Sequence, residues 1–455
     1  MPTPHFTIDR HALATVQQRE AQRYLDTHPR SVALAGDDAK HFLFGVPLHW
    51  IRDWPTPAAL HVARATGNRL WCADGHEYLD FCLGDTAAMF GHSPVPVAQA
   101  IATQAGQGLS AMLPSTLSAE VGRLLSDCFR LPRWQITLSA SDANRFVLRW
   151  ARAVTGRPRV LVFDGCYHGT VDDPLVDMDA QQRTVTRASL LGQLHDLALG
   201  TVVVPFNDIA AVEHALSRGD VACVLTEPAL TNCGLVPPRP GFLQALQEAC
   251  RRHGTLFVLD ETHTLSSGWG GHARVEELEP DLMVIGKAIA GGLPCAVYGF
   301  TEVMNRRMEA AQRSAPDGHS GIGTTLSANL LAMAALRANL AEVMTPAACA
   351  AMCRTAEAIE ARLRDVIAAA GAPWSVIRLG ARMELQFCGQ PPQTGAQARA
   401  AMDDMLERGL HLWLPNRGTP ITPFHNMLLA SPATCTADAE PLATALADFI
   451  AAVRA

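Results

Sequence analysis

The sequence lacks the cysteine patterns that mark disulfide frameworks and metal sites. Its 12 cysteines stand singly, without C-x-x-C pairs or clusters with histidine. In a long chain this pattern is typical of buried, reduced thiols that act as small apolar side chains. We therefore expect a cytoplasmic protein without a metal centre.

Long apolar runs and blocks of positive charge are also missing. No uninterrupted apolar stretch approaches the length of a bilayer span, and the start, MPTPHFTIDRHALATVQQREAQRYLDTHP, lacks the basic and apolar segments of a secretory signal. The 37 basic and 44 acidic residues give a net charge of −7 without a basic block. These absences argue against a membrane or a nucleic acid as partner and favour small molecules.

Two common enzyme motifs do not occur. GWGGHA and GIGTTL do not match G-x-G-x-x-G and do not lie between a strand and a helix, which argues against a dinucleotide-binding oxidoreductase. No G-x-S-x-G is present, which argues against a serine hydrolase.

From about Gly67 onward, the sequence alternates short apolar runs with longer segments of helical period. The 455 residues, 48% of them hydrophobic, are enough for two or more packed units. Apolar runs of this kind are typical of strands buried on both faces, and their alternation with helices predicts a mainly parallel α/β sheet. The expected strands are WQITLSA, RVLVFDG, VACVLTEP, TLFVLDE, DLMVIGK and AVYGF.

The segments on either side of this region have a different texture. The first residues look separate, and after about Leu330 the chain is alanine-rich and helical, with the strand-like pieces WSVIRLG, MELQF and GLHLWLP. We therefore expect an N-terminal segment of a small domain at 1–66, a large domain at 67–330 and a C-terminal small α+β domain at 331–455.

Two expected strands end on ionisable side chains. TLFVLDE carries Asp260, and DLMVIGK carries Lys287, at the carboxyl ends of successive strands. In doubly wound sheets, ligands bind beyond these ends. An acid and an amine are therefore expected at one edge of the sheet, either as a structural ion pair or as part of a cofactor site.

Pyridoxal phosphate (PLP) is a cofactor that needs such a pair. It requires an amine for a Schiff base, an acid beside its ring nitrogen, a flat partner for the ring and an anion cradle for the phosphate. Lys287 supplies the amine. Asp260 supplies the acid, because a nearby carboxylate favours the protonated form of the ring nitrogen.

The other two requirements have candidates in the sequence. The small residues Ser139, Ala140 and Ser141 directly precede an amphipathic helix, whose first backbone N–H groups can bind phosphate. Tyr167, shortly after another expected strand, is the candidate for the flat partner.

Six motifs follow one another between about Gly67 and Leu336, over more than half of the chain. They are LSASDANRFVLRWARAVTGRP, FDGCYHG, EPALTNCGLVPP, LFVLDETHT, DLMVIGKAIAGGLP and GTTLSANLLAMAA. In this order they resemble the class III PLP-dependent aminotransferases, and within them the glutamate-1-semialdehyde 2,1-aminomutase-like branch.

The resemblance implies PLP fold type I: a large domain with a mainly parallel seven-stranded sheet, a smaller α+β domain made from both chain ends, and a homodimer with shared active sites. It also implies roles for particular residues. Lys287 forms the Schiff base, and Asp260 contacts the ring nitrogen. The remaining cofactor contacts implied are Ser139, Ala140, Ser141, Tyr167, His168, Asn232, Thr262, His263 and, from the neighbouring subunit, Thr325.

Several positions depart from the family pattern. Ala140 stands where the family usually has glycine, and Thr262 stands where it usually has valine. His263 would either contact the ring hydroxyl or simply pack. Relatives that bind a substrate carboxylate often have an arginine near the segment GVPLHWIRDW, where this chain has Trp50, with Arg52 two residues further on. Both are candidate substrate residues.

The activity implied is transfer of an amino group from an amine or amino acid to a keto acid or aldehyde, through the Lys287 Schiff base and pyridoxamine phosphate. Lys287, once released, would act as the general base. A glutamate-1-semialdehyde-type intramolecular aminomutase stays open as an alternative. From a different class, a non-catalytic binding protein on the same scaffold also stays open.

Overall fold

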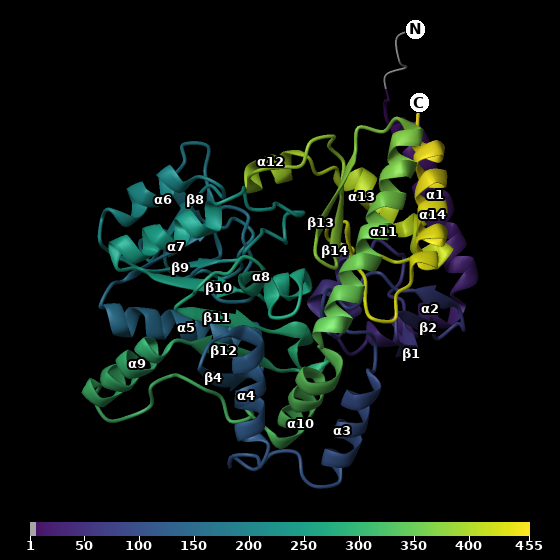
Figure 1. Cartoon of the computed structure of the whole chain (residues 1–455). Coiled ribbons are helices and arrows are strands. Elements are labelled where there is room, and N and C mark those ends of the chain that lie inside the picture. The colour runs from purple at the N-terminus through teal and green to yellow at the C-terminus, as the bar shows by residue number, and fades with distance from the viewer. Residues whose placement is uncertain (1–5) are drawn as a thin grey trace. The chain divides into compact units, whose positions relative to one another are not determined.

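The computed structural model describes residues 6–455, which form two compact units (Figure 1). The larger unit contains Pro94–Ala350 and Pro392–Ala400, and the smaller unit contains the described residues up to Ser93 together with Ala351–Pro391 and Ala401–Ala455. These boundaries are not those of the domains expected at 1–66, 67–330 and 331–455, and that division stays a prediction. Among residues 6–455, no helix is long and apolar enough to cross a membrane.

The larger unit is built around a seven-stranded sheet in the order β4-β12-β11-β10-β9-β5-β8. Strand β12 is antiparallel to both of its neighbours, and the pairs joining β11, β10, β9, β5 and β8 are parallel. The sheet is therefore mainly parallel, as expected. Its strands are β4 (Arg133–Thr137), β5 (Arg159–Phe163), β8 (Thr201–Val204), β9 (Val221–Thr226), β10 (Leu256–Asp260), β11 (Leu282–Ile285) and β12 (Ala296–Phe300).

All six strands expected from the sequence are present, and the edge strand β8 is additional. Strands β9, β10, β11 and β12 are buried along their whole length, which explains their apolar sequences without polar alternation. Helix α5 contacts β4, β9, β11 and β12, while α7 contacts β10. The helices of this unit are α3 (Val95–Ala105), α4 (Ser118–Phe129), α5 (Ala140–Thr155), α6 (Ile209–Leu216), α7 (Phe242–His253), α8 (Gly271–Val275), α9 (Glu302–Ser314), α10 (Leu330–Ala338) and α12 (Gly395–Ala400).

The smaller unit combines both ends of the chain. Its two three-stranded antiparallel sheets are β1-β2-β3 (Val62–Thr66, Arg69–Cys72, Glu77–Leu79) and β13-β14-β15 (Ser375–Leu379, Arg382–Gln386, Met427–Leu429). Its helices are α1 (Arg10–Thr27), α2 (Pro29–Asp38), most of α11 (Pro346–Ala370), α13 (Asp404–Trp413) and α14 (Ala439–Val453).

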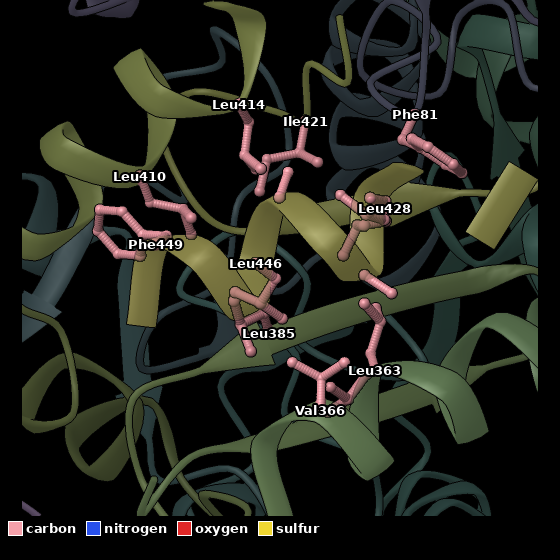
Figure 2. Packing of buried hydrophobic residues seen from close by; sticks show 14 of the residues in the cluster. Phe81, Leu363, Val366, Leu385, Leu410, Leu414, Ile421, Leu428, Leu446 and Phe449 are labelled. Carbon is pink, nitrogen blue, oxygen red and sulfur yellow. The ribbon is translucent and has the colours of Figure 1, made fainter. Parts of the chain in front are cut away.

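One buried cluster joins these elements. Figure 2 shows Leu410 of α13, Leu446 and Phe449 of α14, Leu385 of β14 and Leu363 of α11 packed together. The same cluster contains Leu13 and Val16 of α1, so the hydrophobic effect links the two chain ends in one core.

The strand-like piece GLHLWLP is not a strand, so this prediction was wrong. It belongs mostly to α13, which begins after Asp403, whose carboxylate accepts a hydrogen bond from the Leu406 backbone N–H at 3.0 Å. Leu406, Leu410 and Trp413 recur at helical spacing and are buried. The N-terminal cap and this one-sided burial outweigh the local strand propensity.

Candidate active site

The strand ends that carry the candidate residues lie at one edge of the large sheet. Asp260, the last residue of β10, pairs with Val284 of β11, and Leu259 pairs with Thr226 of β9. The carboxyl ends of these three strands are therefore in register. Loops leaving them bring Glu227, Asp260, His263 and Lys287 together.

Lys287 lies two residues beyond β11, at the start of a short 3₁₀ segment, Lys287–Ala290. Its backbone has a φ of 48°, in the left-handed region that non-glycine residues rarely adopt. Its Nζ lies 2.5 Å from His263 Nε2. The sequence left open whether His263 contacts a cofactor or packs, and the structure places this imidazole against the lysine amine.

Asp260 is buried, and its carboxylate receives several hydrogen bonds. Oδ2 accepts from Asn144 Nδ2 at 2.8 Å and lies 3.0 Å from His168 Nδ1, and Oδ1 accepts from the Thr262 N–H at 3.1 Å. Burial alone would raise the pKa of Asp260, but the hydrogen bond and charge of His168 lower it below its usual value. Asp260 is thus held as a carboxylate.

His168 is the counterpart of this carboxylate. Burial alone would lower the pKa of the imidazole, but Cys166 and the hydrogen-bonded Asp260 raise it to about 10. The two side chains therefore form a buried ion pair at neutral pH. His168 lies against Asp260, so the structure gives it a supporting position beside the acid.

A second set of contacts extends from Lys287 in the other direction. His263 Nδ1 is hydrogen-bonded to the Thr231 hydroxyl, which is also hydrogen-bonded to Glu227. Glu227 Oε2 lies 3.8 Å from His263 Nδ1. Burial raises the pKa of Glu227 to about 7, against the opposing effects of His168 and Thr231.

The start of α5 lies close to the loops of the lysine and the tyrosine. Ser139 caps the helix, with its Oγ accepting from the Asp142 N–H at 3.2 Å. A Cβ on Gly286, directly before Lys287, would lie 2.8 Å from the Ala140 Cβ. The Thr170 N–H donates to Ser141 Oγ at 3.0 Å, so this helix start packs directly against both loops.

The remaining expected site residues have the following positions. Tyr167 is half-buried and donates its backbone N–H to Glu227 Oε1 at 3.3 Å. Asn232 is half-buried in the loop after β9, and Thr325 is exposed. Trp50 and Arg52 belong to the smaller unit, where Trp50 lies near Phe424. The roles of these residues toward a cofactor or substrate stay predictions.

The residues of the large unit fit the requirements of PLP. The acid is ionised and rigidly held, the amine follows the neighbouring strand, and the N-terminus of the 16-residue helix α5 approaches the lysine loop so closely that only glycine fits at position 286. A carboxylate, an amine and a helix start at one sheet edge supply three of the four groups that this cofactor needs.

Sequence reasoning missed three residues of this arrangement. Glu227 follows β9 at the same sheet edge, so the rule that selected Asp260 and Lys287 also applies to it. Thr231 lies in an irregular loop, and Asn144 lies within α5, so neither position carries a comparable signal.

The fold and this arrangement define a PLP-dependent enzyme of fold type I. The family model for aminotransferase class III matches residues 51–446, and the chain belongs to this family. The chain is 35% identical to a glutamate-1-semialdehyde 2,1-aminomutase of Anaeromyxobacter sp. (strain Fw109-5), over 77% of this chain and 83% of that protein.

Solved structures agree with this assignment. A lysine-to-alanine variant of a glutamate-1-semialdehyde-aminomutase from Pseudomonas aeruginosa PAO1, in complex with PMP, is 44% identical, covers 98% of this chain and 99% of its own, and has a TM-score of 0.95. A beta-phenylalanine aminotransferase from Variovorax paradoxus is 28% identical, covers 96% of this chain and 97% of its own, and has a TM-score of 0.85. Membership of this enzyme family removes the support for a non-catalytic binding protein.

Proposed function

We propose that the protein is a glutamate-1-semialdehyde 2,1-aminomutase-type enzyme, which moves an amino group from carbon 2 to carbon 1 of an amino-aldehyde. The observation that carries this proposal is the 44% identity, over 98% of the chain, to the Pseudomonas enzyme of that description. It favours the intramolecular alternative over the intermolecular transfer expected first from the sequence.

The residues at the sheet edge have distinct tasks in this proposal. Bound PLP supplies an electron sink and the group that carries nitrogen between the two carbons. Asp260, held by Asn144 and His168, would keep the ring nitrogen protonated. Lys287 would hold the cofactor through Nζ and, once released, would take and return a proton there.

The start of α5 would hold the phosphate. Its first backbone N–H groups and the positive end of the helix dipole favour an anion there. Ser139 keeps this turn in place by capping it. The predicted contribution of Thr325 from a second subunit, with the homodimer that it requires, and the predicted cytoplasmic location belong to the same proposal.

Intermolecular aminotransfer, from an amine or amino acid to a keto acid or aldehyde, is the second candidate. It is favoured by the aromatic residue Trp50, which stands where relatives that bind a substrate carboxylate often have an arginine. Arg52, two residues further on, has its guanidinium 3.9 Å from the centre of the Phe44 ring, so it stacks on an aromatic side chain. An aromatic group at this position suits a bulky or aromatic amine better than a small dicarboxylic acid.

One experiment separates the two candidates. The purified, PLP-loaded protein is incubated with glutamate-1-semialdehyde alone, and separately with a panel of amines and amino acids plus pyruvate or 2-oxoglutarate. Isomerisation of the semialdehyde with little transfer to the external acceptors supports the proposal. Efficient transfer without isomerisation would overturn it in favour of the second candidate.

The matched control is Lys287→Ala. We expect this variant to lose turnover in both assays and to carry no adduct at position 287 after borohydride treatment, as read by mass spectrometry. Turnover near that of the wild type without added amine would contradict the role of Lys287.

A further inference from the structure

Four side chains form a continuous hydrogen-bonded chain that ends on Lys287. Glu227 is bonded to the Thr231 hydroxyl, Thr231 to His263 Nδ1, and His263 Nε2 to Lys287 Nζ at 2.5 Å. Glu227, Thr231 and His263 are all buried. The following inference deepens the proposed function and rests on it, because it assumes that Lys287 is the group that takes a proton.

The chemistry of the groups sets one direction along the chain when Glu227 is ionised. A carboxylate only accepts hydrogen bonds, so the Thr231 hydroxyl donates to Glu227. The Thr231 oxygen then accepts from His263 Nδ1–H, which leaves a lone pair on Nε2. Nε2 is therefore positioned to accept an N–H of Lys287.

We propose that Glu227, Thr231 and His263 act as positioning residues that stabilise the ammonium form of Lys287 and so make this lysine a stronger base. When Lys287 takes a proton, the Nζ lone pair forms the new N–H bond and the electron pair of the broken C–H bond stays with the substrate. The positive charge that appears on Nζ faces an imidazole polarised by the buried carboxylate.

Other charged groups near the chain leave this polarity in place. Glu227 faces His263 and also the charges of His168 and Asp260, which form their own ion pair. The charge of His168 has the larger effect of the two and lowers the pKa of Glu227, so it favours the ionised carboxylate. Burial raises the pKa of Glu227 to about 7, so its negative charge, and the stabilisation of the Lys287 ammonium, are present above about pH 7 and are lost as the pH falls below it.

The composition of the chain makes a direct test practical. The full sequence contains only two lysines, Lys287 and Lys40. Lys40 is exposed and paired with Asp37, so it serves as an internal reference. Acetic anhydride acylates only neutral amines, so the pH dependence of labelling, read by mass spectrometry, reports the protonation of each lysine separately.

The test uses the full-length enzyme in its pyridoxamine phosphate form, in which the Lys287 amine is not bonded to the cofactor. Three variants are compared with the wild type: Glu227→Gln removes the charge, Thr231→Val removes the bridging hydroxyl, and Thr231→Ser retains it. We expect the labelling midpoint of Lys287 to fall by about one pH unit in Glu227→Gln. It falls less in Thr231→Val and stays near that of the wild type in Thr231→Ser, while Lys40 does not change.

A second readout separates this effect from simple damage to the fold. The reaction followed is the half-reaction in which an amine substrate converts bound PLP to pyridoxamine phosphate, called here the amine half-reaction. With a weaker base, the acid limb of the pH profile of its rate moves to lower pH, and the plateau rate falls. A structural defect would lower the plateau without moving the limb.

An unchanged or raised Lys287 midpoint in Glu227→Gln would overturn the inference. If the wild type nevertheless isomerises the semialdehyde normally, that outcome contradicts only the positioning role of Glu227, Thr231 and His263. If the Lys287 labelling midpoint falls in Glu227→Gln but the wild type does not isomerise the semialdehyde, the result contradicts only the proposed function.

Discussion

At the scale of single residues, Asp260 owes its charge to its neighbours. An isolated carboxylate in a buried site would become protonated, because desolvation disfavours the charged form. Here the side chains of Asn144 and His168 both bond to one of its oxygens. Since neither partner is adjacent to Asp260 in sequence, the ionisation of this acid depends on tertiary packing.

Asn144→Leu tests this dependence. The substitution replaces the asparagine amide, a hydrogen-bond donor, with an apolar side chain of similar size, so Asp260 has fewer hydrogen bonds. We therefore expect the pKa of Asp260 to rise and PLP to bind more weakly. The acid limb of the amine half-reaction should move to higher pH, as measured by stopped-flow absorbance.

Asn68→Leu is the matched control. It breaks a buried hydrogen bond from asparagine to aspartate, between Asn68 and Asp438 at 2.9 Å, within the smaller unit. We expect it to lower thermal stability without moving the acid limb. Equal displacement of the limb in both variants would contradict a specific role for Asn144.

At the scale of elements, the loop after β5 depends on a glycine. Gly169 has a φ of 81°, and a Cβ there would overlap Ser141 Oγ at the start of α5. The loop that carries Tyr167 can therefore approach this helix only if residue 169 has no side chain.

Gly169→Ala should displace the start of α5 and weaken cofactor binding. Gly219→Ala is its control, because Gly219 has a φ of 71° but no atom within 4 Å of the added Cβ. Both variants should lose about 1 kcal/mol from the left-handed backbone. Only Gly169→Ala should also raise the dissociation constant for PLP, as measured by fluorescence titration. A similar constant in both variants would argue against the close packing at Ser141.

Helix α13 carries another buried group with a shifted pKa. His411 is hydrogen-bonded to Asn426 at 2.9 Å, and burial lowers the pKa of its imidazole to about 3. In the unfolded chain a histidine titrates near pH 6.5. Between these values the unfolded state binds a proton that the folded state does not, so stability falls as the pH is lowered through this window.

His411→Phe should remove this dependence. We expect wild-type stability to fall by about 1.4 kcal/mol more per pH unit than that of the variant as the pH is lowered below about 6. Urea unfolding at a series of pH values measures the difference. Parallel curves for the two proteins would show that His411 is protonated in the folded state.

At the scale of the whole molecule, the exposed Thr325 is predicted to complete the site of a second subunit. If it does, a site takes Lys287 from one chain and Thr325 from the other. Lys287→Ala and Thr325→Ala homodimers would then each have two defective sites, whereas a mixed dimer would have one complete site.

Mixing equal amounts of these two variants under conditions of subunit exchange should restore activity. Random pairing makes half of the dimers mixed, each with one complete site, so about a quarter of wild-type activity is expected. Separate incubation of the two variants is the control. No recovery despite proven exchange, read by mass spectrometry of differently tagged chains, would place Thr325 outside the neighbouring site.

Much of the large unit could be predicted from the sequence. The six expected strands, and the position of Asp260 and Lys287 after two of them, follow from local apolar runs and from the rule that parallel strands share their carboxyl edge. Local patterns were less reliable in the smaller unit. The apolar residues of GLHLWLP suit a strand, but they also have helical spacing, and burial of one face of the segment favours the helix.

The amino-acid sequence alone thus determined the α/β class, the strand ends and the residue types available for chemistry, because these depend on short-range periodicity and chain direction. Packing in three dimensions decided the rest. It brought Asn144 and His168 to Asp260, and Thr231 and His263 between Glu227 and Lys287. Protonation and hydrogen bonding depend on distances of a few ångströms between segments far apart in the chain, which periodicity does not encode.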